Sequence, residues 1–239
     1  LGHQVATDYI DLMDRKLAGE GVTLVDRQLS CAPIPSEEGQ RYLGAMAAGA
    51  NFAWANRQLI TEGVRRAFAS VLGASREEIS VVYDIAHNIA KLEEHAVDGA
   101  PRRVLVHRKG ATRAFPAGRE EVPSPYRRFG QPVLIPGDMG TASYVLVGLP
   151  TALDRSFGSS CHGAGRLLSR HAAVRAFRYD EVTRRLSEKG IVVRAASREG
   201  VTEEAPGAYK NVEEVVRVAE GAGLTRRVAR LRPLGVVKG

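Results

Sequence analysis

The residues best suited to chemistry lie in one short stretch, Ser-Ser-Cys-His-Gly-Ala-Gly-Arg at positions 159–166. The side chains around His162 are small or absent, so the backbone there can approach a bulky ligand closely. Leu167, Leu168 and the residues after them predict a helix, which would place His162 near a helix N-terminus. Free N–H groups and the positive end of the helix dipole at that point favour a phosphate and disfavour imidazolium. We therefore expect a neutral His162 that can act as a nucleophile.

Two arginines follow this histidine at helical spacing. Arg166 and Arg170 stand four residues apart, so on a helix they would share one face and could clamp an anion. A plainer interpretation is a glycine-containing turn that only starts a helix. The residues of the stretch alone leave both interpretations open.

A second polar pair follows a candidate strand. Residues 79–83 are short and rich in β-branched side chains, which predicts a strand, and His87 and Asn88 come shortly after it. Loops that follow strands often carry functional side chains, so these two residues are site candidates. An isolated histidine is, however, more often structural than a metal ligand. His95 lies in a charged stretch and is expected at the surface.

Two more turns could face phosphate or nucleotide. A predicted strand at 103–108 ends in the basic run Lys-Gly-Ala-Thr-Arg at 109–113, which suits a phosphate-facing patch or, equally, a solvated basic turn. The second turn, Pro-Gly-Asp-Met-Gly-Thr-Ala-Ser at 136–143, lies between expected strands at 132–135 and 144–147. Its glycines, acid and hydroxyls resemble a nucleotide-binding turn, although any tight connection uses similar residues.

Charge and cysteine content indicate the kind of partner and the compartment of the protein. The 239 residues include 34 Lys and Arg against 27 Asp and Glu, a net charge of +7, which favours a polyanionic partner. A basic composition alone is weak evidence, because many basic proteins bind no nucleic acid. Cys31 and Cys161 are too few for a disulfide framework and indicate a reducing, cytoplasmic compartment, with Cys31 as a packed free thiol. No apolar run approaches membrane-spanning length, and we expect no membrane partner.

The rest of the pattern alternates helices with short strands. Helices are expected at 5–17, at 36–72 as one or two packed helices, at 174–186, and at 212–220 with Asn211 as the N-cap. Further strands are expected at 190–196 and in the tail at 226–238. Polar residues within 51–58 fit either a solvated face or support for a buried polar site. With no repeat and no linker, we expect one α+β domain over 1–239, with mixed sheets and packed helices.

Eight strings carry a resemblance to a known family. In chain order they are Leu-Gly-His-Gln-Val (1–5), Asn-Phe-Ala-Trp-Ala-Asn-Arg (51–57), Val-Tyr-Asp-Ile-Ala-His-Asn (82–88), His-Arg-Lys-Gly-Ala-Thr-Arg-Ala-Phe-Pro (107–116), Ile-Pro-Gly-Asp-Met-Gly-Thr (135–141), Ser-Cys-His-Gly-Ala-Gly-Arg (160–166), Glu-Ala-Pro-Gly-Ala-Tyr-Lys (204–210) and Val-Lys-Gly (237–239). Together they resemble the RtcB family of RNA ligases. The resemblance covers the whole chain and corresponds to about the C-terminal half of such a ligase.

The resemblance implies an RtcB-like fold and a ligase dependent on GTP and Mn²⁺. Such a ligase joins an RNA 3′-phosphate or 2′,3′-cyclic phosphate to a 5′-hydroxyl, in tRNA splicing or RNA repair, so the implied partners are tRNA halves or broken RNA ends. The resemblance makes His162 the guanylylated residue, whose phosphoramidate to GMP passes the nucleotide to the RNA 3′-phosphate. It also makes His87 a manganese ligand, a role that imidazole can fill beside carboxylate and thiolate.

The same resemblance implies a set of nucleotide contacts. Tyr209 is expected to stack near the base. The implied set is His87, Asn88, Pro136, Gly137, Asp138, Met139, Ser143, His162, Gly163, Ala164, Gly165, Tyr209 and Lys238.

The resemblance also implies metal ligands that these residues do not include. In the family an Asp, a Cys and two His lie upstream of the string that opens this chain, so we expect a fragment that is inactive by itself. Two other classes of function remain open. One is a non-catalytic RNA-binding module, and the other is a metal-dependent phosphoesterase that uses His87 without a covalent nucleotide. A guanylate bound covalently to histidine would exclude both.

Overall fold

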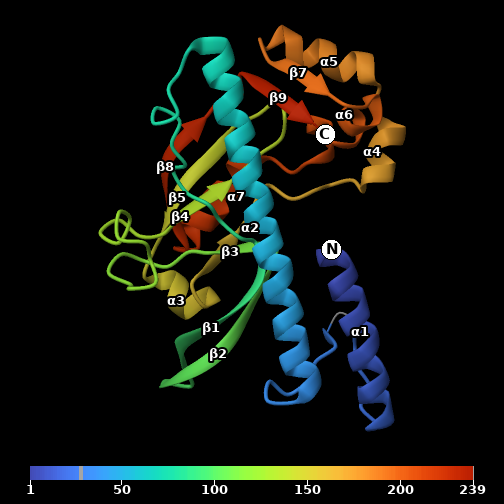
Figure 1. Ribbon diagram of the computed structural model, residues 1–239, viewed down its shortest axis with the longest axis vertical. Helices are drawn as coiled ribbons and strands as arrows, with labels where there is room; N and C mark the ends of the chain where they lie inside the picture. The colour runs from blue at the N-terminus through green and yellow to red at the C-terminus, as the bar shows by residue number, and fades with distance from the viewer. Residues whose placement is uncertain (27–28, 239) are drawn as a thin grey trace. The chain divides into compact units, whose positions relative to one another are not determined.

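The computed structural model describes residues 1–26 and 29–238 and divides into two compact units, residues 1–82 and the residues from 83 onward (Figure 1). The predicted α+β class is confirmed, because helices and several small sheets alternate along the chain. That one domain extends over 1–239 stays a prediction. Among the described residues, no helix is both long and apolar enough to cross a membrane.

The described residues of the first unit include two α-helices. Helix α1 (Gly2–Gly19) agrees with the predicted helix, and α2 (Glu37–Leu72) is one continuous helix of 36 residues. Ser36 caps α2 by accepting a hydrogen bond from the Gly39 amide at 3.1 Å, and the left-handed Gly73 ends it. The polar residues of 51–58 are mostly exposed on α2, which favours the solvated face.

Cys31 corrects one prediction in this unit. Its side chain is exposed rather than packed. The loop that carries it runs through two prolines before α2 begins, and these residues make few buried apolar contacts. The free thiol therefore has no core to enter.

The second unit is built on four small sheets. The hairpin of β1 (Asn88–Val97) and β2 (Ala100–Lys109) turns at Asp98 and Gly99, both with positive φ, as a two-residue hairpin requires. Three other pairings follow: β3 (Ala111–Arg113) with β6 (Ser159–Cys161), β4 (Pro132–Ile135) with β5 (Ser143–Gly148) and β8 (Thr225–Leu231), and β7 (Val192–Ala195) with β9 (Gly235–Lys238). The last pair is parallel, and the other pairings among the described residues are antiparallel.

Short helices cover these sheets. They are α3 (Thr151–Ser156), α4 (Arg170–Ala176), α5 (Tyr179–Glu188), α6 (Arg198–Glu203), the 3₁₀ turn Pro206–Ala208, and α7 (Val212–Gly221), which Asn211 caps as predicted. Figure 1 shows α7 beside the β4–β5–β8 sheet, and α5 and α6 beside β7 and β9. One apolar cluster lies under the three-stranded sheet around Tyr144 and Leu146, and a second lies under α5 around Leu186 and Val201.

Three predictions for the chain after α2 are wrong. Residues 79–83 form no strand: they belong to none of the sheets of the described residues, and the first strand begins only at Asn88. The helix predicted at 174–186 is two helices, because Phe177 and Arg178 adopt extended backbone between α4 and α5. His95 is buried at 5% exposure rather than at the surface, because it contacts the Glu93 carboxylate.

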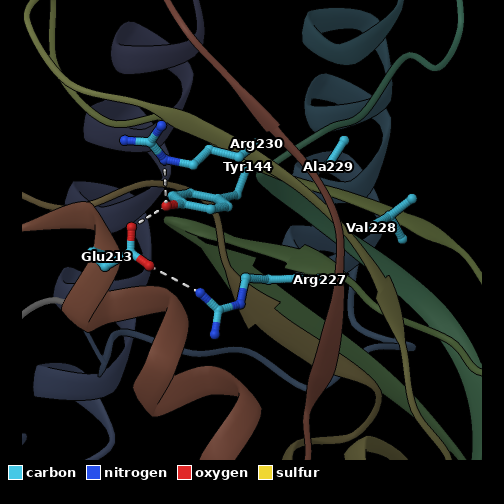
Figure 2. A pocket seen from close by; sticks show the side chains of 6 residues that line it. All are labelled: Tyr144, Glu213, Arg227, Val228, Ala229 and Arg230. Atoms are coloured by element: carbon cyan, nitrogen blue, oxygen red, sulfur yellow. Dashed lines mark hydrogen bonds and ion pairs between the residues drawn. The ribbon is translucent and has the colours of Figure 1, made fainter.

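A polar cluster holds β8 against α7 (Figure 2). The Tyr144 hydroxyl donates to the Glu213 carboxylate and accepts from Arg230 Nε at 3.1 Å, while Arg227 donates to Glu213 at 2.9 Å. The pocket that these residues line with Val228 and Ala229 includes none of the predicted site residues. Because its polar groups satisfy one another, we interpret this cluster as structural.

Candidate active site

His162 lies directly after strand β6, not at a helix N-terminus. Helix α4 begins only at Arg170, so residues 163–169 separate the histidine from it, and the predicted helix-dipole environment is wrong. The position of His162 comes instead from the pairing of Cys161 with Ala111. This pairing brings the ring beside Gly110, which has a φ of +65°, and a Cβ there would lie 3.4 Å from His162 Nε2.

His87 and His162 face each other. Their rings are stacked with centroids 4.4 Å apart and planes only 3° from parallel. The His87 carbonyl accepts from the Ala111 amide at 3.4 Å, and the Asn88 side-chain oxygen accepts from the Gly110 amide at 2.9 Å. The start of β1 is therefore joined to the same β2–β3 turn that contacts His162. Two histidines 75 positions apart in the sequence thus form one group.

His162 is held in its neutral form by its surroundings. Burial lowers the pKa of His162 first, and the nearby His87 lowers it further. The predicted neutral imidazole agrees with this direction, but the cause is burial and a second imidazole rather than a helix dipole. A neutral ring keeps a nitrogen lone pair available at physiological pH.

The glycine-containing turn at 136–143 lies against the His162 loop. The Ala164 amide donates to the Pro136 carbonyl at 3.0 Å, and a Cβ on Gly163 would lie 3.6 Å from the same oxygen. Within the turn, Asp138 Oδ1 accepts from the Gly140 amide at 2.7 Å, and Oδ2 accepts from the Thr141 hydroxyl at 2.9 Å. Two predicted nucleotide loops therefore form one backbone surface.

Two residues of this turn have side chains with other roles. The Met139 side chain is 5% exposed and packs in the second apolar cluster, so any ligand contact it makes is through its backbone. The Asp138 carboxylate is occupied by the turn itself. Ser143, the remaining predicted contact here, is the half-buried first residue of β5 and pairs with Leu231.

Two other predicted site residues, Tyr209 and Lys238, contact the carboxylate of Glu204. Glu204 accepts from the Tyr209 hydroxyl, lies 3.2 Å from Arg166 Nη1 and 3.4 Å from Lys238 Nζ, and has Arg170 Nη2 at 3.9 Å. The Arg166 guanidinium also lies over the Tyr209 ring, 4.8 Å from its centroid. Arg166 and Arg170 therefore do not share a helix face as predicted, and in this structure both contact carboxylates.

Backbone hydrogen bonds join this Glu204 cluster to the His162 loop. The Lys210 amide donates to the Gly165 carbonyl at 3.0 Å, and the Leu167 amide donates to the Ala208 carbonyl at 2.8 Å. Lys238, the last residue of β9, reaches the cluster because β9 pairs in parallel with β7. Sequence reasoning did not identify Glu204 or Gly110 as members of the site, although both stand in the strings of the resemblance.

The basic run at 109–113 does not form one patch. Arg108, just before it, is buried and bonded to Glu93. Arg113 donates to the Gln131 side chain at 3.0 Å and to the Glu121 carbonyl at 2.9 Å. Because both guanidinium groups point into protein contacts, neither the phosphate-facing patch nor the fully solvated turn describes this segment.

We expect Glu204 to control the ionisation of Tyr209. Burial and the Glu204 carboxylate together raise the pKa of Tyr209 to about 12. Glu204→Gln removes the negative charge, so the pKa should fall toward 10, as measured by phenolate absorption during an alkaline titration. Glu203→Gln is the matched control, because Glu203 pairs with Arg170 and leaves the phenol unaffected.

The raised pKa of Tyr209 also makes the stability of the fold depend on pH. An unfolded tyrosine ionises near pH 10, below the pKa of about 12 of Tyr209 in the folded protein. The protonated phenol therefore stabilises the folded state fully below pH 10, and this stabilisation is lost as the pH rises toward 12. An unchanged phenol titration in Glu204→Gln would contradict the assignment.

Comparison with known proteins gives the family. The family model described as "tRNA-splicing ligase RtcB" matches residues 1–239, the whole chain. The chain belongs to the RtcB family. Proteins named tRNA-splicing ligase RtcB from Thermococcus kodakarensis, Pyrococcus abyssi and Archaeoglobus fulgidus are 59%, 58% and 56% identical to it over 241 residues. These alignments cover 100% of this chain but 50%, 26% and 50% of the relatives, so the chain spans half of their length or less.

The RtcB resemblance also implies a manganese ion, and the described residues do not form its site. Among residues 1–26 and 29–238, no three His, Cys, Asp or Glu side chains are grouped so that they could hold a metal. His87 offers one imidazole beside the His162 ring. Cys161 is not part of any such group among the described residues, and burial raises the pKa of its free thiol.

Proposed function

We propose that this RtcB-family protein acts in an RNA ligase that joins an RNA 3′-phosphate or 2′,3′-cyclic phosphate to a 5′-hydroxyl, with GTP and Mn²⁺ as cofactors. The proposed substrates are tRNA halves or broken RNA ends, and the proposed compartment is the cytoplasm. One observation carries the proposal: a neutral, half-buried His162 ring lies against bare glycine backbone, where two glycine-containing loops meet.

His162 has the properties of a nucleophile toward phosphorus. In the proposed first step, a nitrogen of the neutral ring attacks the α-phosphorus of GTP. A P–N bond forms, the P–O bond to the β-phosphate breaks, and pyrophosphate leaves. An oxygen of the RNA 3′-phosphate then attacks the same phosphorus, and the P–N bond breaks; a 2′,3′-cyclic phosphate is first opened by water, which breaks its P–O2′ bond and leaves a 3′-phosphate and a 2′-hydroxyl. The 5′-hydroxyl finally attacks the activated 3′-phosphate, loses its proton and displaces GMP.

The residues around His162 fit a guanylate. The 136–140 turn and the 162–165 loop present backbone with little side-chain bulk, which allows a nucleotide to come close. Arg166 and Lys238 supply positive charge beside this surface, both currently balanced by Glu204. Tyr209 places its ring under the Arg166 guanidinium at the edge of the same loop. We propose that these groups bind and orient the nucleotide.

The proposal includes manganese because of the family resemblance, and His87 is the one residue named here as its ligand. Because the described residues form no group of three metal-binding side chains, we assign no step to the ion. The side-chain oxygen of Asn88 accepts a hydrogen bond from the Gly110 amide. We propose that its side-chain N–H₂ group donates to the nucleotide.

The proposal is tested by incubating the natural full-length protein with GTP and Mn²⁺. We expect the protein to gain the mass of one guanylate, as measured by mass spectrometry, and the adduct to be labile in acid and stable in alkali, as a phosphoramidate is. Binding of RNA without an adduct would instead indicate a non-catalytic module. Release of phosphate from RNA ends without an adduct would indicate a phosphoesterase.

A further inference from the structure

Arg108 is a buried arginine that the proposed chemistry does not use. It lies on β2, with its side chain 2% exposed. Its Nη1 and Nη2 atoms donate to the two oxygens of Glu93 on β1, each at 2.8 Å. His95 Nε2 lies 3.0 Å from Glu93 Oε2, the oxygen that also accepts from Arg108 Nη2. Such a two-point pair fixes the plane and direction of the guanidinium.

The other hydrogen bonds of Arg108 leave the hairpin. Its Nε donates to the Ser159 hydroxyl at 2.9 Å, and its Nη2 donates to the Phe157 carbonyl at 2.9 Å. Ser159 is the first residue of β6, and His162 follows directly after that strand. Both of these bonds therefore end on the segment that leads to His162.

This segment has an unfavourable backbone that needs support. Phe157 has a φ of +49°, in the left-handed region that bulky side chains rarely adopt. Gly158 follows with a φ of +59°, and a Cβ there would overlap the Phe115 ring. The Arg108 bond to the Phe157 carbonyl holds this turn at its strained residue. The His95 ring also packs edge-on against Phe157, with centroids 5.1 Å apart.

Strand β6 has little pairing of its own to fix it. It pairs with β3 over only three residues, from Ser159 with Arg113 to Cys161 with Ala111. A three-residue pairing supplies few hydrogen bonds, so small shifts of β6 would move the His162 ring relative to Gly110 and His87. The buried Arg108 group adds two bonds at the start of this strand.

We propose that Arg108 is a positioning residue for His162. Anchored by Glu93, it holds the turn at 157–159 and so sets where β6 ends. The importance of this position for nucleotide transfer rests on the proposed function of His162. The placement of β6 itself can be measured without any ligase activity.

The experiment compares variants of the natural full-length protein. The double variant Glu93→Gln/Arg108→Met removes the arginine without leaving a buried carboxylate unpaired. Arg108→Lys keeps a positive charge beside Glu93, but its single nitrogen cannot replace the separate Nε, Nη1 and Nη2 donors through which Arg108 contacts Ser159, Glu93 and Phe157 at once. His95→Phe is the matched control. It breaks the contact with Glu93, retains an aromatic ring against Phe157, and leaves both Arg108 bonds to the turn intact.

Two readouts are taken for each variant. Hydrogen exchange of the amides in 157–162 should be at least tenfold faster in the double variant and in Arg108→Lys than in His95→Phe, while the amides of β4 and β5 keep their protection. The first-order rate constant of guanylylation should fall at least tenfold, with the apparent GTP affinity nearly unchanged, because the 136–140 turn is untouched.

The outcomes separate this proposal from the proposed function. If exchange in 157–162 equals that of the control in both Arg108 variants, Arg108 only stabilises the hairpin and the proposal is overturned. If the double variant fails to fold, Arg108→Lys decides by the same criterion. If the wild-type protein forms no guanylate, the proposed function fails, while the exchange readout still decides whether Arg108 positions β6.

Discussion

His162→Ala should abolish the guanylate adduct in the natural full-length protein incubated with GTP and Mn²⁺. The variant lacks the nitrogen that would bond to phosphorus, so we expect no adduct rather than a slower one. Its fold should persist, because His162 is only half-buried and its ring lies against glycine and another imidazole rather than in an apolar cluster. Mass spectrometry measures the adduct, and thermal unfolding measures the fold.

His171→Ala is the control for this experiment. His171 lies exposed on α4, nine positions further along the chain, so its removal should leave the adduct and the melting temperature unchanged. An adduct of normal yield in His162→Ala would show that His162 does not carry the nucleotide, and its loss in His171→Ala would show that loss of the adduct is not specific to His162.

Gly137→Ala should disrupt the turn that lies beside His162. An added Cβ would overlap the Ala142 carbonyl oxygen, and it would lie 2.7 Å from Thr141 Oγ1 and 3.0 Å from Val212 Cγ1. Because a backbone carbonyl cannot move aside as a flexible side chain does, the whole turn must shift. We expect a loss of about 2 kcal/mol in the free energy of unfolding and a drop in GTP affinity of tenfold or more, measured by calorimetric titration.

Gly163→Ala is the matched control for stability. Its Cβ would meet Pro136 at 3.6 and 3.8 Å, which is ordinary van der Waals contact. The melting temperature of this variant should therefore stay within about 2 °C of the wild type, a shift that corresponds to less than 1 kcal/mol. Equal stability of Gly137→Ala and Gly163→Ala would contradict the close approach at Gly137.

The sequence by itself determined the family and the loops that carry the candidate site. The strings around His162, His87 and Gly137 are local. The turn at 136–143 lies between two strands as predicted, whereas the strand predicted before His87 is absent. Small residues at the His-Gly-Ala-Gly positions also predict that backbone can come close to a ligand there, and this stays a prediction. Local composition is enough for such features, because turn chemistry depends on neighbouring residues only.

The physical cause of the lowered His162 pKa could be identified only from the tertiary structure. A helix dipole and burial beside a second imidazole both lower a histidine pKa, so the sequence predicted the right direction from the wrong element. The missing strand at 79–83 has the same kind of reason. A strand exists only if a partner pairs with it, and β-branched residues cannot show whether one does.

Only the tertiary structure decided which distant residues form the site. Gly110 bounds the His162 ring, Arg108 reaches Ser159 across 51 positions, and Lys238 reaches Glu204 across 34. These contacts arise from the pairing of β3 with β6 and of β7 with β9, which brings segments together that no short stretch of sequence contains. His95 shows the consequence most clearly: surrounded by charged residues in the chain, it is buried because folding places Glu93 and two aromatic rings around it.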